Sequence, residues 1–563
     1  MAKASRGATA ADSGDKSKGK RMQAGDAIAA ILKREGIRNI IGYPVNHVLE
    51  HAARADIRTI IVRQERIGLH MADAMARLSS GSVPGVFAMQ HGPGAENAFG
   101  GVAQAFAESS PILVLPMGYP RRIAHIPPNF NSVINMAHVT KWAEPLTSAR
   151  EIPNVFRRAF GRLRNGRGGP VLVEIPSDVL AEEFPGPLDY RAVPATRTGP
   201  DPDGVQRVAK TLAAARRPVI YAGQGVHYAR AWEELRKLAE RLAAPVTTSL
   251  QGKSAFPEDH PLSLGSGGRA VPKMVHDFLA KADVIFGIGC SFTETNYGVR
   301  MPAGKTIIQA TLDAGDLGKD VPIADALAGD AALTLAALNA ALEEMLPQRR
   351  DPAPVAGEIA AIRAEWMAAW LPKLTSDATP LSPYRVIWDL HNAVDREKAV
   401  ITHDAGSPRD QLSPFWTSSV PLSYIGWGKT TQLGYGLGLA MGAKLAHPEK
   451  LCINVWGDAA IGFTGMDFET AVRERIPILS ILFNNFSMAI ELKVMPVATE
   501  KYRATDISGD YAAMARAFGG YGERVARPEE IVPAIRRGIA ATERGQPALL
   551  EFLTSPDVAL STY

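Results

Sequence analysis

Cysteines and long apolar runs are nearly absent from this sequence of 563 residues. Its only two cysteines, Cys290 and Cys452, lie within apolar stretches. Such a pair favours buried thiols in a reducing compartment and argues against a disulfide framework or a cysteine metal cluster. No segment approaches the roughly 18 consecutive apolar residues that a membrane-spanning helix needs. We therefore expect a cytoplasmic enzyme without a membrane partner.

Outside its first 21 residues, the sequence also has no excess of basic or acidic side chains. The formal net charge of +4 equals the charge of residues 1–21 alone, which hold six basic and two acidic side chains. Residues 22–563 therefore sum to zero, which gives no support to nucleic-acid binding through whole-domain charge. The Ala/Ser/Gly/Lys-rich stretch 1–21 has no apolar core of its own, so we predict a disordered tail there.

The remaining residues repeat one pattern three times. Short apolar, β-branched runs alternate with helix-period segments, which is typical of parallel sheets buried on both faces. The expected strands cover 38–42, 58–62, 84–89, 111–116 and 170–175, then 217–223, 244–250, 282–289 and 305–310, then 398–404, 450–456, 477–485 and 547–553. Proline-rich stretches at 184–202 and 346–357 separate the three groups. We predict three α/β domains with doubly wound parallel sheets, at 22–190, 191–355 and 356–545, followed by the last strand and a C-terminal segment at 546–563.

Polar side chains follow two successive strands near the end of the chain. The run KLCINVW leads into Gly457-Asp458-Ala459, and after residues 460–483 a second strand ends in Asn484-Asn485. Carboxylate and amide oxygens at neighbouring strand ends suit a magnesium ion that holds a diphosphate. The plain alternative is an aspartate that caps a helix and an asparagine pair in a turn.

This arrangement resembles the metal-binding motif of thiamine diphosphate enzymes. In that family the aspartate, the last asparagine and a backbone carbonyl two residues further bind the metal, which implies Asp458, Asn485 and Ser487 as Mg²⁺ ligands. The third motif residue is usually glycine, whereas this chain has Ala459; alanine also occurs there in relatives.

Two further segments resemble the same family. Glu65, at the end of RTIIVRQE, matches the glutamate that polarises the cofactor's pyrimidine, and RIGLHMADAMARLSSG and MQHGPGAEN match the motifs around it. A solvated surface glutamate is the alternative. The run QLGYGLG (432–438) resembles the turn whose apolar side chain, here Leu433, bends the cofactor. The implied cofactor contacts are Tyr43, Pro44, Glu65, Gly92, Asn97, Ala405, Gly406, Ser407, Leu433, Gly457, Asp458, Ala459, Ala460, Asn485, Met488, Ala489 and Ile490.

The resemblance extends from Met22 over nearly the whole chain and is to the acetolactate synthase-like superfamily. It implies a pyrimidine-binding, a central and a diphosphate-binding domain. Because these domains from different subunits share one cofactor in that family, it also implies at least a homodimer and usually a homotetramer.

The residues after Asp458 bear on the reaction. AIGFTGMDFET (460–470) resembles the corresponding run of oxalyl-CoA decarboxylases and 2-hydroxyacyl-CoA lyases. In such lyases a glutamate at the position of Glu491 accepts the proton of the substrate's 2-hydroxyl; the alternative is a surface glutamate that pairs with Lys493. Ile490 and His91 are candidates to line the substrate pocket, Arg409 to contact a CoA phosphate, and the C-terminal segment to cover the site.

We therefore predict a lyase that converts a 2-hydroxyacyl-CoA into formyl-CoA and an aldehyde or ketone. The alternatives are an acetolactate synthase-like carboligase or decarboxylase of free 2-keto acids, and a non-enzymatic homologue, which the presence of Glu65 and Asp458 disfavours. The central domain reads Gly289-Cys290-Ser291-Phe292 where acetolactate synthases carry a basic flavin contact. We expect no FAD there and keep ADP as a candidate ligand.

Overall fold

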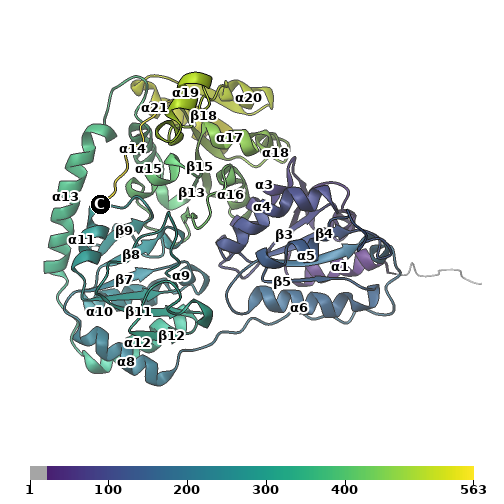
Figure 1. The fold of residues 1–563 in the computed structure, drawn as a ribbon, viewed down its shortest axis with the longest axis horizontal. Helices are drawn as coiled ribbons and strands as arrows, with labels where there is room; N and C mark the ends of the chain where they lie inside the picture. Colours follow the sequence, from purple (N-terminus) through teal and green to yellow (C-terminus); the bar gives the residue numbers. More distant parts are fainter. Residues whose placement is uncertain (1–21) are drawn as a thin grey trace, which may run out of the picture.

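The computed structural model describes residues 22–563, which form three domains that are each built on a six-stranded parallel sheet. The prediction of three parallel α/β domains is therefore confirmed. The predicted N-terminal tail lies outside the described residues. Figure 1 shows the first domain standing to one side of the other two, with the central domain below the third.

The first domain has the strand order β2-β1-β3-β4-β6-β5. Its middle strands β3 and β4 are buried along their whole length, because their apolar side chains face helices on both sides. The strands are β1 Asn39–Gly42, β2 Arg58–Ile61, β3 Gly85–Met89, β4 Ile112–Gly118, β5 Trp142–Pro145 and β6 Val171–Pro176. The helices are α1 Ala24–Arg34, α2 Val48–Arg54, α3 Glu65–Leu78, α4 Pro93–Ala107, α5 Ser132–Asn135, α6 Ile152–Arg164 and α7 Ser177–Leu180.

The central domain follows an extended linker that Figure 1 shows running beneath the molecule. Its strand order is β12-β11-β10-β7-β8-β9. The strands are β7 Pro218–Ala222, β8 Val246–Ser249, β9 Ser263–Gly267, β10 Val284–Ile288, β11 Thr306–Thr311 and β12 Asp325–Ala328. The helices are α8 Pro202–Ala214, α9 Gly225–Tyr228, α10 Trp232–Leu242, α11 Lys273–Lys281 and α12 Ala331–Met345, and α13 Ala353–Leu374 leads on to the third domain.

The third domain has the order β14-β13-β15-β16-β18-β17. The strands are β13 Ala399–His403, β14 Tyr424–Ile425, β15 Leu451–Gly457, β16 Leu479–Asn484, β17 Tyr521–Val525 and β18 Ala548–Leu553. The helices are α14 Pro383–Ala393, α15 Ser407–Phe415, α16 Tyr435–Ala446, α17 Asp458–Thr464, α18 Phe468–Arg473, α19 Pro496–Tyr502, α20 Tyr511–Ala517 and α21 Ile531–Glu543.

The C-terminal segment after β18 lies along the central domain and α13. Ser561 donates a hydrogen bond to the Val271 carbonyl at 2.7 Å and accepts one from the Trp366 indole at 2.9 Å. Lys373 of α13 pairs with Asp557 at 2.5 Å. Figure 1 accordingly shows the C-terminus beside α13. Closure of this segment over the site stays a prediction.

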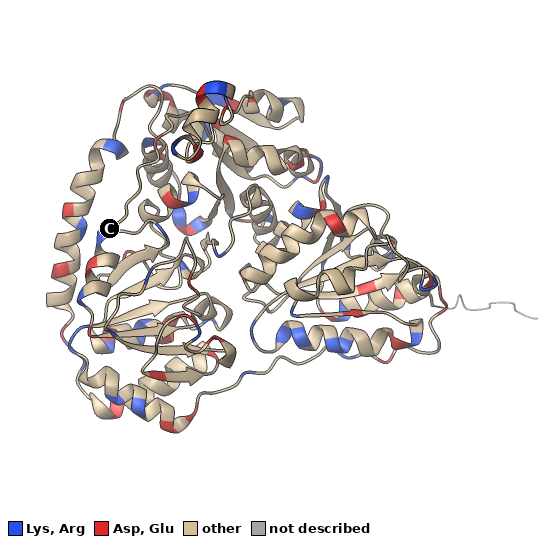
Figure 2. Ribbon diagram, viewed as in Figure 1, with Lys and Arg blue, Asp and Glu red and all other residues tan. Residues whose placement is uncertain are grey.

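The surface mixes both signs of charge. Figure 2 shows basic and acidic residues interspersed over all three domains, with a row of basic residues along α6. Across residues 22–563, the structure contains no helix that is both long enough and apolar enough to span a bilayer.

Candidate active site

The three candidate metal ligands lie at the ends of β15 and β16, which are neighbours in the third sheet. Asp458 is the first residue of α17, directly after β15. Its carboxylate accepts hydrogen bonds from the backbone N–H groups of Ala459 at 2.9 Å, Asn485 at 3.1 Å and Ser487 at 3.2 Å. The structure therefore brings Asp458, Asn485 and Ser487 together around one carboxylate.

This carboxylate has the properties of a cation ligand. Asp458 is only 3% exposed, and burial raises its pKa. Among the residues that the structure describes, no basic side chain pairs with it. The Ser487 hydroxyl beside it is also buried and has no hydrogen-bond partner. Burying a carboxylate without a counter-charge costs free energy. A divalent cation that prefers oxygen ligands, such as Mg²⁺, therefore fits this position.

A second turn of the third domain is organised by Asp404, which follows β13. Its fully buried carboxylate accepts the backbone N–H groups of Ala405 at 2.8 Å, Gly434 at 2.9 Å and Gly436 at 2.8 Å. Burial raises the pKa of Asp404 to about 6. Asp404 thus ties the predicted diphosphate turn, Ala405 to Ser407, to the loop that carries Leu433. The sequence alone marked Asp404 as a strand end and not as this link.

Glu65 is the first residue of α3 and is 5% exposed. Burial raises its pKa, while a hydrogen bond from the Asn97 amide at 3.4 Å opposes the shift. A Cβ atom on Gly94 would lie 3.2 Å from the Glu65 carboxylate, so the glycine turn passes directly beside it. The structure therefore gathers Glu65, Gly92, Gly94 and Asn97, and burial makes the Glu65 carboxyl bind its proton more tightly than an exposed glutamate does.

The loop after β1 closes this end of the first domain. The backbone N–H of Tyr43 donates to the Ala88 carbonyl at 3.1 Å, and the Asn46 side chain donates to the Met89 and Leu115 carbonyls at 2.9 and 2.8 Å. Asn46 thereby joins the ends of β1, β3 and β4. Sequence reasoning selected Tyr43 and Pro44 but missed Asn46, since an asparagine after a strand is also common in turns.

His91 lies in the glycine turn against Tyr119, which follows β4. The two ring centroids are 4.5 Å apart in an edge-to-face arrangement. The Nδ1 atom of His91 is buried without a hydrogen-bond partner, and burial lowers the pKa of the ring. A neutral imidazole with a free nitrogen is suited to contact a polar substrate group, but that role stays a prediction.

Two helices form the closest contact between the first and third domains. Helix α3, which begins at Glu65, packs closely on α16, which begins just after Leu433. Gly438 and Gly442 permit this contact, because a Cβ atom there would lie 2.5 Å from the His70 Cβ and 2.2 Å from the Met71 carbonyl oxygen. The first and third domains thus meet within one chain through α3 and α16.

Asp467 makes a second link between these domains. Its buried carboxylate accepts the backbone N–H of Arg63 at 2.7 Å, two residues before Glu65. Burial raises the pKa of Asp467 to about 6. The sequence identified Asp467 only as part of a motif, because a contact between segments 404 residues apart leaves no local pattern.

The segment after Asn485 returns to the diphosphate turn. The Met488 N–H donates to the Thr505 carbonyl at 2.8 Å, and Glu491 begins a short 3₁₀ helix, Glu491–Lys493. The Ile490 side chain lies 3.8 Å from the position that a Cβ atom on Gly406 would take. The Ile490 side chain therefore lies beside the turn Ala405 to Ser407, whose residues are among the implied cofactor contacts.

Arg409 is buried against Asp410 and Tyr297. It is 2% exposed, and its guanidinium makes two 2.9 Å hydrogen bonds to Asp410 and lies 4.4 Å from the Tyr297 ring centroid. Its Nη1 atom is buried without a partner. Contact with a CoA phosphate stays a prediction.

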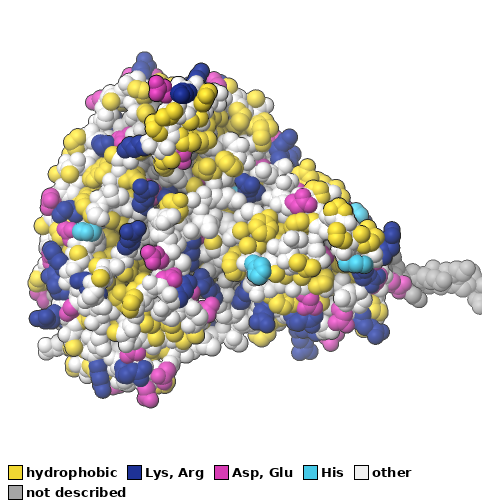
Figure 3. All heavy atoms as spheres, viewed as in Figure 1, with side chains coloured by type: hydrophobic (Ala, Val, Ile, Leu, Met, Phe, Trp, Pro, Cys, Tyr) yellow, Lys and Arg dark blue, Asp and Glu magenta, His cyan; other side chains and the backbone are white. Residues whose placement is uncertain are grey.

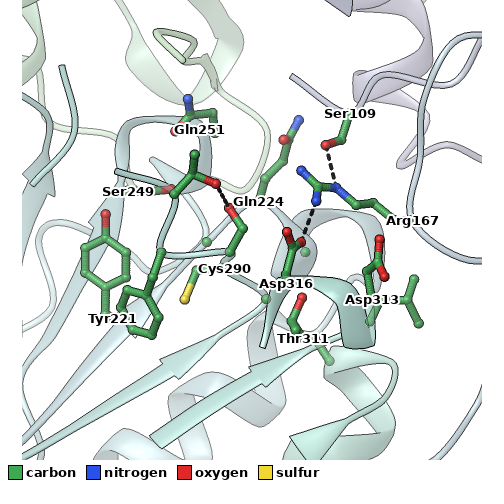
Figure 4. A pocket seen from close by; sticks show the side chains of 18 of the residues that line it. Ser109, Arg167, Tyr221, Gln224, Ser249, Gln251, Cys290, Thr311, Asp313 and Asp316 are labelled. Atoms are coloured by element: carbon green, nitrogen blue, oxygen red, sulfur yellow. Dashed lines mark hydrogen bonds and ion pairs between the residues drawn. The ribbon is translucent and has the colours of Figure 1, made fainter. Parts of the chain in front are cut away.

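A cavity of about 820 Å³ lies elsewhere, between the central domain and the first domain. Figure 4 shows Arg167 reaching into it, where it bonds to Ser109 and to Asp316. Arg164, Arg300 and Lys429 also line it. The segment Gly289 to Phe292 has no basic side chain, but other segments supply basic side chains to this cavity. Arg164 and Arg167 come from the first domain.

Three stretches of the chain match family descriptions. Residues 22–141 match "Thiamine pyrophosphate enzyme, N-terminal TPP binding domain", residues 205–338 the central domain, and residues 404–552 the C-terminal TPP binding domain of the same enzymes. All the metal, glutamate and turn residues described above fall within the first and third of these stretches.

Individual proteins show the same similarity. The chain is 30% identical to a "Probable acetolactate synthase large subunit" of Methanocaldococcus jannaschii, over 96% of this chain and 93% of that protein. It is 31% identical to a "Probable 2-ketoarginine decarboxylase AruI" of Pseudomonas aeruginosa, over 89% of each. The crystal structure of benzoylformate decarboxylase from Polynucleobacter necessarius superimposes with a TM-score of 0.81 at 20% identity, over 96% of this chain and 99% of that chain.

Proposed function

The chain belongs to the thiamine pyrophosphate (thiamine diphosphate) enzymes, and we propose that within this family it is a 2-hydroxyacyl-CoA lyase. The proposed reaction breaks the bond between the first and second carbons of a 2-hydroxyacyl-CoA. Its products are formyl-CoA and an aldehyde or ketone, and the reverse reaction forms the same bond.

The residues present fit the cofactor and a magnesium ion. Asp458 and Asn485, with the Ser487 carbonyl, would hold Mg²⁺, and the backbone N–H groups of Gly406 and Ser407 would hold the diphosphate. When bound, thiamine diphosphate supplies a carbanion that adds to a carbonyl carbon. Glu65 would hold a proton against a pyrimidine nitrogen, and burial raises the pKa of Glu65 in the direction that this role needs.

The observation that carries the lyase proposal is the position of Glu491. It follows Ile490, whose side chain lies near Gly406, and both residues belong to the segment just after the candidate metal ligands Asn485 and Ser487. In the proposed reaction Glu491 accepts the proton of the substrate's 2-hydroxyl as the carbon–carbon bond breaks.

The test mixes the purified protein, thiamine diphosphate and Mg²⁺ with formyl-CoA and acetone or a short aldehyde. The proposal predicts a 2-hydroxyacyl-CoA product and a loss of about 100-fold in rate for Glu491→Gln, the lower end of what a general base contributes. Glu500→Gln is the matched control, since Glu500 is an exposed residue of the neighbouring α19. Equal rates for both variants would remove Glu491 from the mechanism.

A second candidate is a carboligase or decarboxylase of free 2-keto acids, which the names of the relatives favour. Both full-length relatives described above bear such names, at 30% and 31% identity. The same protein incubated with pyruvate alone distinguishes the candidates. Acetolactate or acetaldehyde from pyruvate, without activity on CoA esters, would establish the second candidate and refute the lyase.

We further propose that the central cavity holds an adenine nucleotide. Asp313 lies just beyond the end of β11 at its rim, where an acidic residue can bind ribose hydroxyls, and Arg164, Arg167 and Lys429 can meet phosphates. Mass spectrometry of the small molecules released on denaturation tests this. ADP or a CoA fragment would support the proposal, whereas FAD would contradict our expectation that no flavin binds.

We also propose that the protein is at least a homodimer and forms a homotetramer. Several apolar side chains of the third domain are exposed, and Figure 3 shows apolar surface gathered at the top of the molecule around α19. They include Phe463, Met466, Phe486, Val494, Val497 and Tyr502. Exposed apolar surface of this kind marks association sites. Light scattering coupled to size-exclusion chromatography tests the proposal. We expect the mass of a dimer or tetramer, and the mass of a monomer would contradict the proposal.

A further inference from the structure

One loop of the third domain carries Leu433 and is held by the first domain. Residues 426–434, here called the bridging loop, run from the end of β14 to the start of α16 and carry Leu433 near their end. At the far end of the loop, the Gly434 N–H bonds to Asp404. At the near end, the Gly426 carbonyl accepts a 2.8 Å hydrogen bond from Arg77 of the first domain. The position of Leu433 therefore depends on what holds the loop between these points.

Two side chains at the end of α4 hold the middle of the bridging loop. The Glu108 carboxylate, fully buried, accepts the backbone N–H groups of Gly428 and Lys429, both at 2.9 Å. Gln104, one turn earlier and 1% exposed, accepts the Thr430 hydroxyl at 2.6 Å and the Gln432 N–H at 3.4 Å. The Gln104 amide also donates to the Thr430 carbonyl at 3.4 Å. The first domain thus makes five hydrogen bonds across the interface with these two residues.

Glu108 has no ion-pair partner within hydrogen-bonding distance among residues 22–563, and its second oxygen lacks any hydrogen bond. Burying a carboxylate in this way is costly unless its hydrogen bonds are strong. A leucine or methionine would pack at the end of α4 at lower cost. Unlike those side chains, the Glu108 carboxylate fixes the positions of the Gly428 and Lys429 N–H groups.

We propose that Glu108 and Gln104 are positioning residues that hold the bridging loop in the shape that thiamine diphosphate binding requires. They touch neither the metal motif nor Glu65. They act through the loop backbone on Leu433, which would otherwise have to be ordered when the cofactor binds. The inference rests on cofactor binding by this family and is independent of which substrate the enzyme uses.

The experiment compares Glu108→Gln and Thr430→Val with the wild type. Glu108→Gln removes the charge at nearly constant size, and Thr430→Val removes only the hydroxyl that bonds to Gln104, at an exposed position where folding is not at risk. Glu50→Gln, at an exposed glutamate of α2, is the control. The measurements are hydrogen exchange of peptides spanning 426–434 in the cofactor-free protein, the Kd for thiamine diphosphate at saturating Mg²⁺, and the melting temperature.

The proposal predicts faster exchange at residues 428 and 429 and a Kd raised about tenfold for Glu108→Gln, because hydrogen bonds to a charged acceptor are the stronger ones. For Thr430→Val it predicts a Kd raised about threefold, from one neutral hydrogen bond. Glu50→Gln should match the wild type. A lower melting temperature with unchanged exchange and unchanged Kd would make both residues merely structural and overturn the proposal. If Glu108→Gln does not fold, Thr430→Val alone decides, and an unchanged Kd refutes it.

Discussion

The contact between α3 and α16 should not tolerate one added methyl group at Gly442. A Cβ atom there would lie 2.2 Å from the Met71 carbonyl oxygen and 2.8 Å from its carbonyl carbon. Both are backbone atoms of a helix and cannot rotate away. Because protein interiors are close-packed, Gly442→Ala would have to separate the two helices by roughly 1 Å at this point.

The loss in the free energy of unfolding can be estimated from the contacts that the separation of the helices would disturb. Overpacking by itself costs about 1–3 kcal/mol. The same interface contains the hydrogen bond from the Tyr435 hydroxyl to Asp73, which in turn pairs with Arg77 at 2.7 Å, and a buried polar group left unpaired adds about 1–3 kcal/mol. Alanine's better helix propensity returns about 1 kcal/mol. We expect a net loss of about 3 kcal/mol in the free energy of unfolding.

Gly357→Ala is the matched control. Gly357 lies in the exposed part of α13, and a Cβ atom there would meet nothing within 4 Å. That substitution should raise stability by about 1 kcal/mol through helix propensity alone. Urea unfolding followed by tryptophan fluorescence measures both variants, and the Kd for thiamine diphosphate should rise only for Gly442→Ala. If Gly442→Ala behaved like Gly357→Ala, the domain contact described here would be wrong.

Two further predictions concern the cofactor and the central cavity. Glu65→Gln should keep cofactor binding but lower the turnover rate about 100-fold or more, because only the carboxyl can hold and release the proton. Calorimetry measures the binding, and a steady-state assay measures the rate. Full activity would refute the role of Glu65. Lys429, whose pKa is lowered to about 8 by burial, carries its charge below that pH and loses it above. Binding of ADP to the cavity, measured by calorimetry, should therefore weaken as the pH rises through about 8 in the wild type. Lys429→Met should abolish that pH dependence, while Lys210→Met, at an exposed residue of α8, should retain it, and a flat wild-type profile would contradict the assignment.

The sequence predicted the inner strands of each sheet and, apart from β2, missed the edge strands. The inner strands, such as β4 and β16, are continuous apolar runs because helices cover both faces. The strands that were not predicted are β5, β9, β12, β14 and β17, and each is at an edge of its sheet. They are short or half-exposed, like Trp142–Pro145, or nearly free of apolar residues, like Ser263–Gly267. Edge strands need not be apolar on both faces, so periodicity alone does not reveal them.

The candidate site shows a similar division. Asp458, Asn485 and Glu65 were accessible to sequence reasoning because each follows a predicted strand within a recognisable motif. Asp467, Arg167 and Glu108 were not assigned their roles, because each acts on a segment of another domain. No spacing within the chain encodes such contacts; they arise from how the domains pack.

Titration calorimetry of thiamine diphosphate into the protein in the presence of Mg²⁺ tests the central claim most directly. The account predicts saturable binding of one cofactor per chain for the wild type. It predicts a Kd raised about 100-fold or more for Asp458→Asn, since even changes around a metal's ligands cost 10- to 100-fold. Absence of binding by the wild type, or equal binding by Asp458→Asn, would contradict the assignment of this site.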